Sequence, residues 1–283
     1  MSRVVVVADF FAEEYGGGAE RTTDALISRG METKEIVRLK SADVTEEHVE
    51  SLRDCYWVIC NFANLSALSK LAICKNLNYS IVEYDYKFCV HRSPELHRRQ
   101  EGSECDCSLR EDGKINLAFY GRARKIFFMS VAQRDIFLSH VKTIKQENAI
   151  VLSSVFSDGD LRFIDSIKDN EKEDKYLIVK SSSWVKNLQG CVEYAEKNNL
   201  RYEIVQNLPY QELLIKLSTT KGLIFLPAGE DTCPRLVIEA FMLGCETILN
   251  NNVQHKDEQW FSDRQICSKY MSERAGEFWR HHE

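Results

Sequence analysis

The chain has 283 residues, of which 44% are hydrophobic, 10% aromatic and 28% charged, so it is globular, with room for two ordinary domains or one large one. Its net charge of −6 disfavours a general nucleic-acid-binding surface but is compatible with a local phosphate site. No apolar run approaches ~20 residues and acidic residues interrupt the start of the chain, so we expect neither a membrane-spanning helix nor a signal peptide.

The first half of the chain alternates apolar, β-rich runs with helical patterns. Residues 3–9 form a continuous valine-rich run, which is typical of a strand buried on both faces of a parallel sheet. Thr45 stands at the N-cap position of a short helix. The order β-α-β-α-β-α-β, a long irregular insert, then β-α-β indicates a doubly wound parallel sheet. The expected strands are residues 3–9, 34–39, 56–61, 79–84, 125–129 and 150–152, and the expected helices are residues 19–29, 45–52, 66–75 and 132–140.

Polar, turn-rich residues 153–160 and a charged, solvated stretch up to residue 175 interrupt the pattern, so we expect a hinge near residue 155. The tail, residues 272–282, is an amphipathic helical pattern. The sequence thus predicts two Rossmann-like units, whose ligands would bind outside the carboxyl ends of the strands, across a cleft. In the second half, strands are expected at residues 176–180, 202–205, 222–226 and 246–250, and helices at residues 187–198, 210–218 and 234–243.

Three consecutive glycines, Gly16, Gly17 and Gly18, follow the first strand and open the first helix. Glycine lets the backbone approach a ligand without a Cβ clash, and the helix N-terminus beyond offers N–H groups and positive dipole potential to a phosphate. The segment matches neither the G-x-G-x-x-G pattern nor the P-loop. A flexible turn followed by a helix cap is the alternative interpretation.

A second candidate, KSSSWVKN, follows the first strand of the second half. Lys180, Ser181 and Lys186 lie where an anionic ligand of an open sheet would lie, and a lysine ammonium is a compact point charge for phosphate. The alternative is a serine-rich surface turn with Trp184 packed beside it.

The stretch PAGEDTCPRLVIEAFMLGC ends a buried strand and enters an apolar helix. Asp231 or Thr232 can cap this helix. Arg235 lies in its first turn, where a cation opposes the helix dipole, which suggests a nearby anionic ligand. Glu239 lies among apolar neighbours, where a carboxylate must be hydrogen-bonded or paired, for example by sugar hydroxyls.

Residues 82–108 follow the fourth strand and should overhang the same cleft. Three cysteines of this stretch, with either histidine, can make a zinc site, although structural zinc sites usually show C-x2–4-C pairs and C-x-C is an awkward spacing. Free thiols or a redox-sensitive pair are the alternative, and we assign no metal to the ligand site. The ten cysteines as a whole lie mostly in apolar contexts, which favours a reducing, cytoplasmic setting. The residues concerned are Cys89, His91, His97, Cys105 and Cys107.

Together these features resemble the GT-B glycosyltransferases, most nearly the retaining family-4 type (glycosyl transferases group 1). The resemblance rests on the two-domain plan, the GGGAE turn, the Lys-Asn pair after the seventh strand and an acidic pair eight residues apart. Pro227, Glu239, Ala240 and Gly244 are in register with the family's strand-ending proline, the second acid and alanine of its E-x7-E-A motif and a later glycine. The first acid is Asp231 where the family has glutamate, and Thr232-Cys233-Pro234-Arg235 replaces the usual small-aromatic-small step.

The resemblance implies two Rossmann-like, doubly wound parallel-sheet domains facing across a cleft: residues 1–155 on the acceptor side, residues 156–270 binding the nucleotide sugar, and residues 271–283 as a helix that crosses back to the first domain. It also implies a glycosyltransferase, hexosyltransferase-like, that moves a sugar from a nucleoside-diphosphate sugar to an acceptor with retention. No cofactor or catalytic metal is implied. The nucleotide base, the sugar and the acceptor, a glycan or small molecule, stay open, as does the oligomeric state. We expect no nucleic-acid partner and no membrane association.

By the same resemblance, Glu239 would bind the ribose hydroxyls, Asp231 the donor-sugar hydroxyls and Lys186 the diphosphate. Asp85 and His91 are positional candidates for a general base. The alternatives are a nucleotide-sugar 2-epimerase-like enzyme, a degenerate, non-catalytic GT-B binding protein and a nucleotide-binding regulator. We expect Glu239→Ala to abolish donor binding and leave the fold intact. The remaining donor-binding candidates are Gly16, Gly17, Gly18, Lys180, Ser181 and the backbone N–H groups of Cys233, Arg235 and Leu236.

Overall fold

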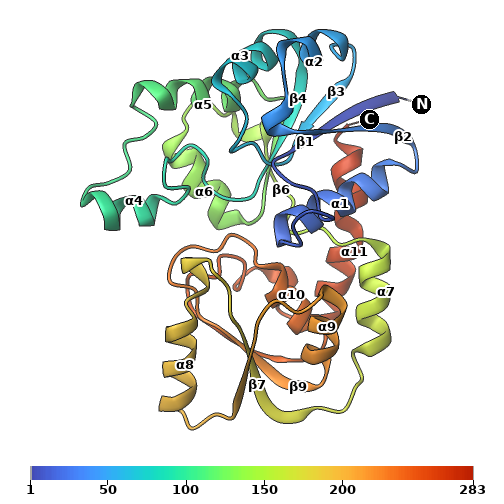
Figure 1. The fold of residues 1–283 in the computed structure, drawn as a ribbon, viewed down its shortest axis with the longest axis vertical. Helices are drawn as coiled ribbons and strands as arrows, with labels where there is room; N and C mark the ends of the chain where they lie inside the picture. The colour runs from blue at the N-terminus through green and yellow to red at the C-terminus, as the bar shows by residue number, and fades with distance from the viewer. Residues whose placement is uncertain (1, 283) are drawn as a thin grey trace. The chain divides into compact units, whose positions relative to one another are not determined.

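The computed structural model describes residues 2–282, with residues 111 and 112 described by their backbone alone. It divides into two compact units, the first comprising Met1–Val155 and Arg274–Glu283 and the second Phe156–Glu273. Each unit is a parallel sheet with helices packed against it (Figure 1). The α/β fold class predicted from the alternating pattern is confirmed.

The sheet of the first unit has the strand order β2-β1-β3-β4-β5-β6, and every neighbouring pair runs parallel. Residues 4–8 and 57–59 are buried on both faces of the sheet, which is why they read as continuous apolar runs. All six strands fall where the sequence predicts them. They are β1 (Ser2–Ala8), β2 (Lys34–Lys40), β3 (Tyr56–Ile59), β4 (Asn78–Glu83), β5 (Lys125–Phe128) and β6 (Ala149–Val151).

The four predicted helices of the first unit are also present, and polar side chains fix the starts of three of them. Thr45 caps α2 in a capping box with His48, and Ser66 and Ser130 accept hydrogen bonds from the backbone N–H groups at the starts of α3 and α6. These helices are α1 (Gly18–Gly30), α2 (Glu46–Ser51), α3 (Ala67–Asn76) and α6 (Val131–His140).

The insert after β4 is not irregular, as the sequence predicted, because it contains helices α4 (Pro94–Glu101) and α5 (Glu111–Arg122). Ser93 caps α4, Pro94 occupies its first turn, and Gly102 ends it in the left-handed conformation at φ 69°. Each is a standard helix boundary signal. The prediction missed α4 because six of its eight residues are polar or charged, which hides the apolar periodicity.

The sheet of the second unit has the order β10-β9-β7-β8, again all parallel. Its core gathers Tyr176, Ile178, Cys191, Ala195 and Ile224. The predicted strands and helices are confirmed as β7 (Glu173–Val179), β8 (Tyr202–Val205), β9 (Thr220–Phe225), β10 (Glu246–Leu249), α8 (Leu188–Lys197), α9 (Tyr210–Ser218) and α10 (Arg235–Met242).

Two helices of the second half differ from the prediction. The stretch predicted to be turn-rich and solvated contains α7 (Asp158–Ile167), which Ser157 caps and which buries Ile164. The C-terminal helix α11 (Arg264–Arg280) begins eight residues earlier than residue 272 and extends from the second unit into the first. Its Trp279 indole donates to the Leu26 carbonyl oxygen at 2.9 Å.

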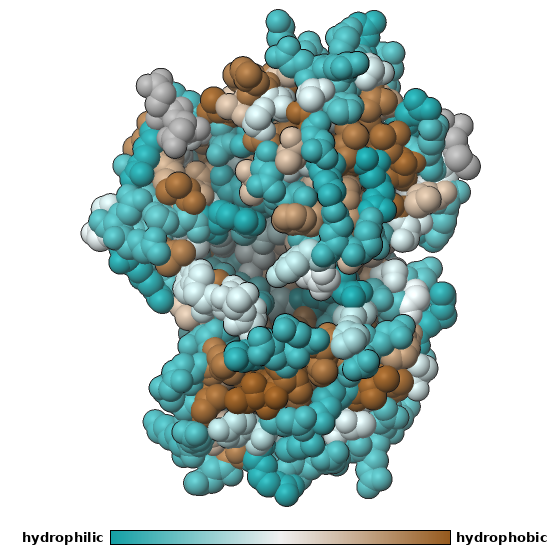
Figure 2. All heavy atoms as spheres, in the orientation of Figure 1, coloured by the Kyte–Doolittle hydropathy of each residue, from teal (hydrophilic) through white to brown (hydrophobic). Residues whose placement is uncertain are grey.

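Polar side chains cover much of the face shown in Figure 2, and hydrophobic side chains gather in a band across the second unit. Ile204 and Ile215 are large hydrophobic residues of that unit with more than two-fifths of their surface exposed. In residues 2–282, no helix has both the length and the apolar content to cross a bilayer.

Candidate functional site

The strand order of the second unit brings two of the predicted ligand-binding loops together. Because β7 and β9 are parallel neighbours, the loops that leave their carboxyl ends lie at the same edge of the sheet. The Ala228 N–H donates to the Val185 carbonyl oxygen at 2.8 Å, and the Asn187 side-chain amide donates to the Leu226 carbonyl oxygen at 2.8 Å. Two segments about 40 residues apart thus form one hydrogen-bonded surface.

Lys186 and Asp231, one from each loop, form an ion pair on this surface. The Lys186 Nζ lies 2.7 Å from Asp231 Oδ2, and it also lies 4.8 Å from the centre of the Phe225 ring. The Lys186 side chain is 33% exposed and that of Asp231 14%, so the pair is accessible from solvent. The Asp231 backbone is fixed by a bond from its N–H to the Asn252 carbonyl oxygen at 2.8 Å. The structure therefore joins two residues that the sequence assigns to the donor.

Glu239 belongs to a second, buried cluster in the same unit. Its Oε1 accepts hydrogen bonds from Arg235 Nε and from the Tyr210 hydroxyl, both at 2.8 Å. Arg235 also donates to Asp160 Oδ2 at 2.6 Å and lies 3.8 Å from the Phe156 ring centre. Burial raises the pKa of the Glu239 carboxyl, and the positive charge of Arg235 opposes that rise.

The cluster corrects two sequence-based expectations about the start of α10. The cation at the start of α10 needs no ligand to balance it, because Asp160 and Glu239 already do so. Glu239 also has hydrogen-bonding partners within the protein, so its burial does not by itself require sugar hydroxyls. The N-cap residue of α10 is Pro234, and no side chain caps the helix, so neither Asp231 nor the buried Thr232 does.

The other donor-binding candidates lie near Lys186 and Asp231 in the sequence, and their side chains make fewer contacts. Lys180 is exposed, and its backbone N–H donates to the Val205 carbonyl oxygen at 2.8 Å. Ser181 is exposed and accepts from the Ser183 N–H at 3.1 Å. Cys233 is buried and Leu236 half-buried, immediately before and inside the uncapped first turn of α10.

In the first unit, the glycine turn leads directly into α1. Gly17 is the N-cap residue, with no side-chain cap, while Gly16 and Gly18 are exposed. A Cβ atom at Gly17 would clash with the Glu20 carboxylate and lie 2.8 Å from the Tyr15 ring, so a larger residue there would have to displace these two side chains. The carboxyl group of Glu20 is buried, which raises its pKa.

The structure separates the two candidate bases. Asp85 accepts hydrogen bonds from Lys87 Nζ at 3.0 Å and from Arg92 Nε at 2.7 Å, so it is held by two cations. His91 Nε2 instead lies 2.8 Å from Glu101 Oε1. These are two different clusters of the insert after β4.

Sequence reasoning missed a buried carboxylate, Glu83, at the end of β4. It is fully buried, lies 2.8 Å from Lys87 Nζ, and accepts from the Tyr120 hydroxyl at 2.5 Å. Burial raises its pKa to about 7. The signal in the sequence is a glutamate that ends an apolar strand with a lysine four residues later, a spacing that allows pairing.

Only solved structures gave matches to this chain: no protein-family model and no curated protein sequence matches it. The UDP-forming α,α-trehalose-phosphate synthase of Burkholderia xenovorans matches with a TM-score of 0.60 and 10% identity, covering 99% of this chain and 97% of that one. The Anabaena protein HepE, solved with UDP and glucose, matches at 0.57 and 9% identity, covering 99% and 95%. An α-glucosyltransferase solved with UDP and a 13-mer DNA containing a HMU base matches at 0.52 and 9% identity, covering 99% and 96%.

The chain has the GT-B fold. The matches extend over nearly the whole of each chain and include both parallel-sheet units. In this chain the loops after β7 and β9 carry Lys186 and Asp231, and α10 begins directly after the second loop.

Proposed function

We propose that the chain is a glycosyltransferase that transfers a sugar from a nucleoside-diphosphate sugar to an acceptor. The observation that supports this most directly is the accessible Lys186–Asp231 ion pair at the carboxyl ends of β7 and β9, next to the uncapped N-terminus of α10. An open parallel sheet binds ligands at this edge, and a cation beside a helix N-terminus suits a diphosphate.

In this proposal each group of the second unit has a role that its geometry supports. Lys186 exchanges its bond to Asp231 for the diphosphate and stabilises the negative charge that develops on the leaving group. Asp231, released from Lys186, accepts hydrogen bonds from the donor sugar. The first-turn N–H groups of α10 and the side chains of Lys180 and Ser181 flank the phosphates.

In this proposal Glu239 binds the ribose, and its buried contacts restrict which of its oxygen atoms can do so. Both hydrogen bonds described above end on Oε1, so we assign the ribose contact to Oε2. Arg235 acts through Glu239, which it orients, instead of contacting the phosphates directly. Tyr210 and Asp160 complete this support.

The first unit supplies the acceptor side in the proposal. The backbone of Gly16, Gly17 and Gly18 approaches the ligand, and Asp85 or His91 is the candidate base. The reaction proceeds with retention and needs no catalytic metal. We place it in the cytoplasm, in keeping with ten free cysteines.

The solved neighbours favour uridine diphosphate as the carrier, because HepE and the trehalose-phosphate synthase are described with UDP or as UDP-forming. One neighbour was solved with a 13-mer DNA. For this chain, the net charge of −6 favours a glycan or a small molecule over nucleic acid.

Calorimetric titration with UDP, GDP and ADP tests the donor site. We expect UDP to bind the wild-type chain and Lys186→Ala to weaken its binding at least tenfold, while Lys197→Ala, at an exposed lysine of α8, leaves it unchanged. Equal affinities of the two variants would rule out the diphosphate role of Lys186.

The products formed from sugar derivatives of whichever nucleotide binds then distinguish the candidate activities. A glycoside formed from the donor and a panel of glycan acceptors supports a transferase. Isomerised nucleotide sugar without a glycoside indicates an epimerase, and binding without turnover indicates a non-catalytic protein.

A further inference from the structure

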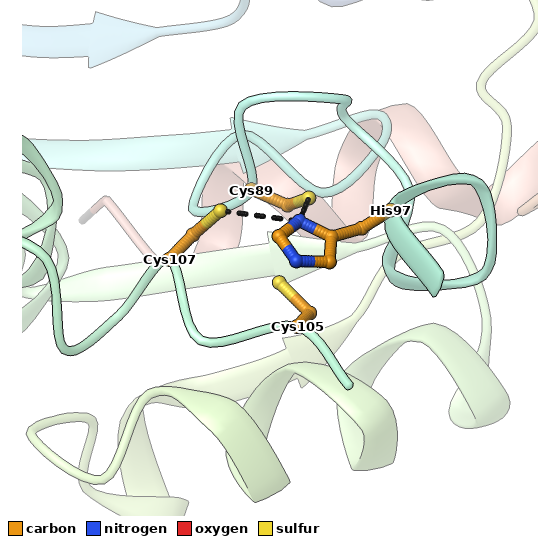
Figure 3. A group of neighbouring side chains, drawn as sticks. All are labelled: Cys89, His97, Cys105 and Cys107. Atoms are coloured by element: carbon orange, nitrogen blue, oxygen red, sulfur yellow. Dashed lines mark hydrogen bonds between the residues drawn. The ribbon is translucent and has the colours of Figure 1, made fainter. Parts of the chain in front are cut away.

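Four side chains converge in the segment between β4 and α5, outside the proposed donor site. Figure 3 shows the imidazole of His97 surrounded by the thiols of Cys89, Cys105 and Cys107. One nitrogen or sulfur atom from each of the four lies within 4.8 Å of the other three. All four residues are buried, and His97 is fully buried.

The distances match those that a tetrahedral zinc ion imposes on its ligands. The Nδ1 atom of His97 lies 3.5 Å from the Cys107 sulfur and 3.8 Å from the Cys89 sulfur. With Zn–S near 2.3 Å and Zn–N near 2.05 Å, tetrahedral angles place nitrogen and sulfur about 3.6 Å apart. Three cysteines and one histidine are also a common ligand set of closed structural zinc sites.

The surroundings are those of a metal-bound histidine and thiolates. The His97 Nε2 atom is buried and makes no hydrogen bond, yet Glu101 Oε2 lies 3.4 Å from it. A carboxylate in this position orients a zinc-binding imidazole. The Val90 N–H points to the Cys107 sulfur at 3.5 Å, as donors to metal thiolates do.

We propose that Cys89, His97, Cys105 and Cys107 bind one zinc ion, which fixes the insert between β4 and α5. The segment between β4 and α5 contains one helix of eight residues, so an ion that ties its start, its α4 helix and its end together stabilises it. The ion also holds one wall of a cavity of about 280 Å³, whose lining includes Cys89, Cys107 and Lys87.

A neighbouring group of possible ligands, His91, His97 and Glu101, is a weaker candidate. It shares His97, but His91 is half-buried and Glu101 is exposed in the insert. His91 and Glu101 already pair with each other, and Glu101 also pairs with Arg110. His91→Ala therefore serves to distinguish the two groups.

Elemental analysis of the full-length chain, purified without a histidine tag or chelator from zinc-supplemented cultures, tests the site. We expect about one zinc per chain in the wild type and less than a fifth of that in Cys105→Ala. The matched control is Cys60→Ala, which removes another buried thiol, directly after β3, and should retain the zinc, as should His91→Ala.

A second measurement does not depend on the variants' folding. Wild-type protein reconstituted with Co²⁺ should show intense thiolate-to-cobalt charge-transfer absorption, and X-ray absorption of the zinc form should fit three sulfur ligands and one nitrogen. Wild-type protein without stoichiometric zinc, a disulfide among the three cysteines in freshly purified protein, or zinc loss from Cys60→Ala equal to that from Cys105→Ala would each overturn the proposal.

Discussion

Glu239 and Arg235 lie one turn apart on α10, and the two side chains are almost completely buried. Their spacing could be read from the sequence, and so could the need of a buried carboxylate for a partner. Tyr210 and Asp160 could not, since they lie 25 and 75 residues from Arg235 and reach it only through the packing of α7 and α9. Local spacing could thus have indicated half of this cluster, whereas tertiary contacts supply the rest.

The burial of this pair changes the expected result of replacing Glu239. Glu239→Ala leaves the Arg235 charge with one fewer partner in the interior, so we expect the free energy of unfolding to fall by roughly 3 kcal/mol or more. Glu239→Gln keeps the shape and a hydrogen-bonding oxygen and should cost less. Urea unfolding followed by circular dichroism measures both changes.

The matched control is Glu193→Ala, at an exposed glutamate of α8. It should change the unfolding free energy by less than about 0.5 kcal/mol. If Glu239→Ala is as stable as this control, the buried pair does not contribute to the fold. A loss of donor binding by Glu239→Ala would then reflect the lost ligand contact and not unfolding.

At the scale of elements, the strands were predicted well because parallel strands buried on both faces are near-continuous apolar runs. Helix α5 was missed with the rest of the insert. Helices α4 and α7 were missed because α4 is mostly polar or charged and because the turn-rich and charged stretches around α7 hid its apolar residues. Their N-caps, Ser93 and Ser157, were the available signals, and in α4 Pro94 follows its cap directly. These capping residues would have identified the two helices although the apolar periodicity did not.

Replacing glycine with alanine should have opposite effects at two positions of the second unit. In β9, a Cβ atom at Gly222 would lie 2.5 Å from the Glu246 carbonyl oxygen and 2.6 Å from the Tyr176 ring, so Gly222→Ala should destabilise the chain by about 1–3 kcal/mol. At Gly159 in the first turn of α7, the nearest atom would be 3.7 Å away. Gly159→Ala should therefore stabilise by up to ~1 kcal/mol, because alanine favours a helix.

Thermal unfolding of the two variants beside the wild type measures these changes. A fall in melting temperature for Gly222→Ala and a rise for Gly159→Ala is the expected pair of results. A fall for Gly159→Ala similar to that of Gly222→Ala would argue against α7, the helix that the sequence did not predict.

At the scale of the whole molecule, the predicted chain order of strands is correct in both units, whereas the return of the C-terminal helix to the first unit was expected only from the family resemblance. Residues 274–283 join the first unit through contacts such as Trp279 with Leu26, 253 residues earlier in the chain. The amphipathic pattern of the tail indicated a packed helix. The earlier start at Arg264 was missed although Cys267 and Met271, four residues apart and both fully buried, extend the apolar face toward it.

A buried histidine makes the stability of the molecule depend on pH. His255 is fully buried, stacked on Trp260 with ring centres 5.2 Å apart, and neither ring nitrogen makes a hydrogen bond. Burial lowers its pKa to about 3. Because the folded-state pKa lies below the ordinary value of about 6.5, the unfolded chain takes up a proton first as pH falls, so stability present above pH 6.5 is lost progressively towards pH 3.

We expect this histidine to account for roughly 2 kcal/mol of lost stability between pH 7 and pH 5, since each unit of pKa difference is worth about 1.4 kcal/mol. His255→Phe keeps an aromatic ring in the stack and removes the titration, so its unfolding free energy should fall less over the same range. Trp260→Phe disturbs the same stack but leaves His255 in place, so it should keep the wild-type pH dependence at a lower overall stability. Urea unfolding at both pH values measures all three proteins, and identical pH dependence in the wild type and His255→Phe would show that the buried imidazole does not couple protonation to unfolding.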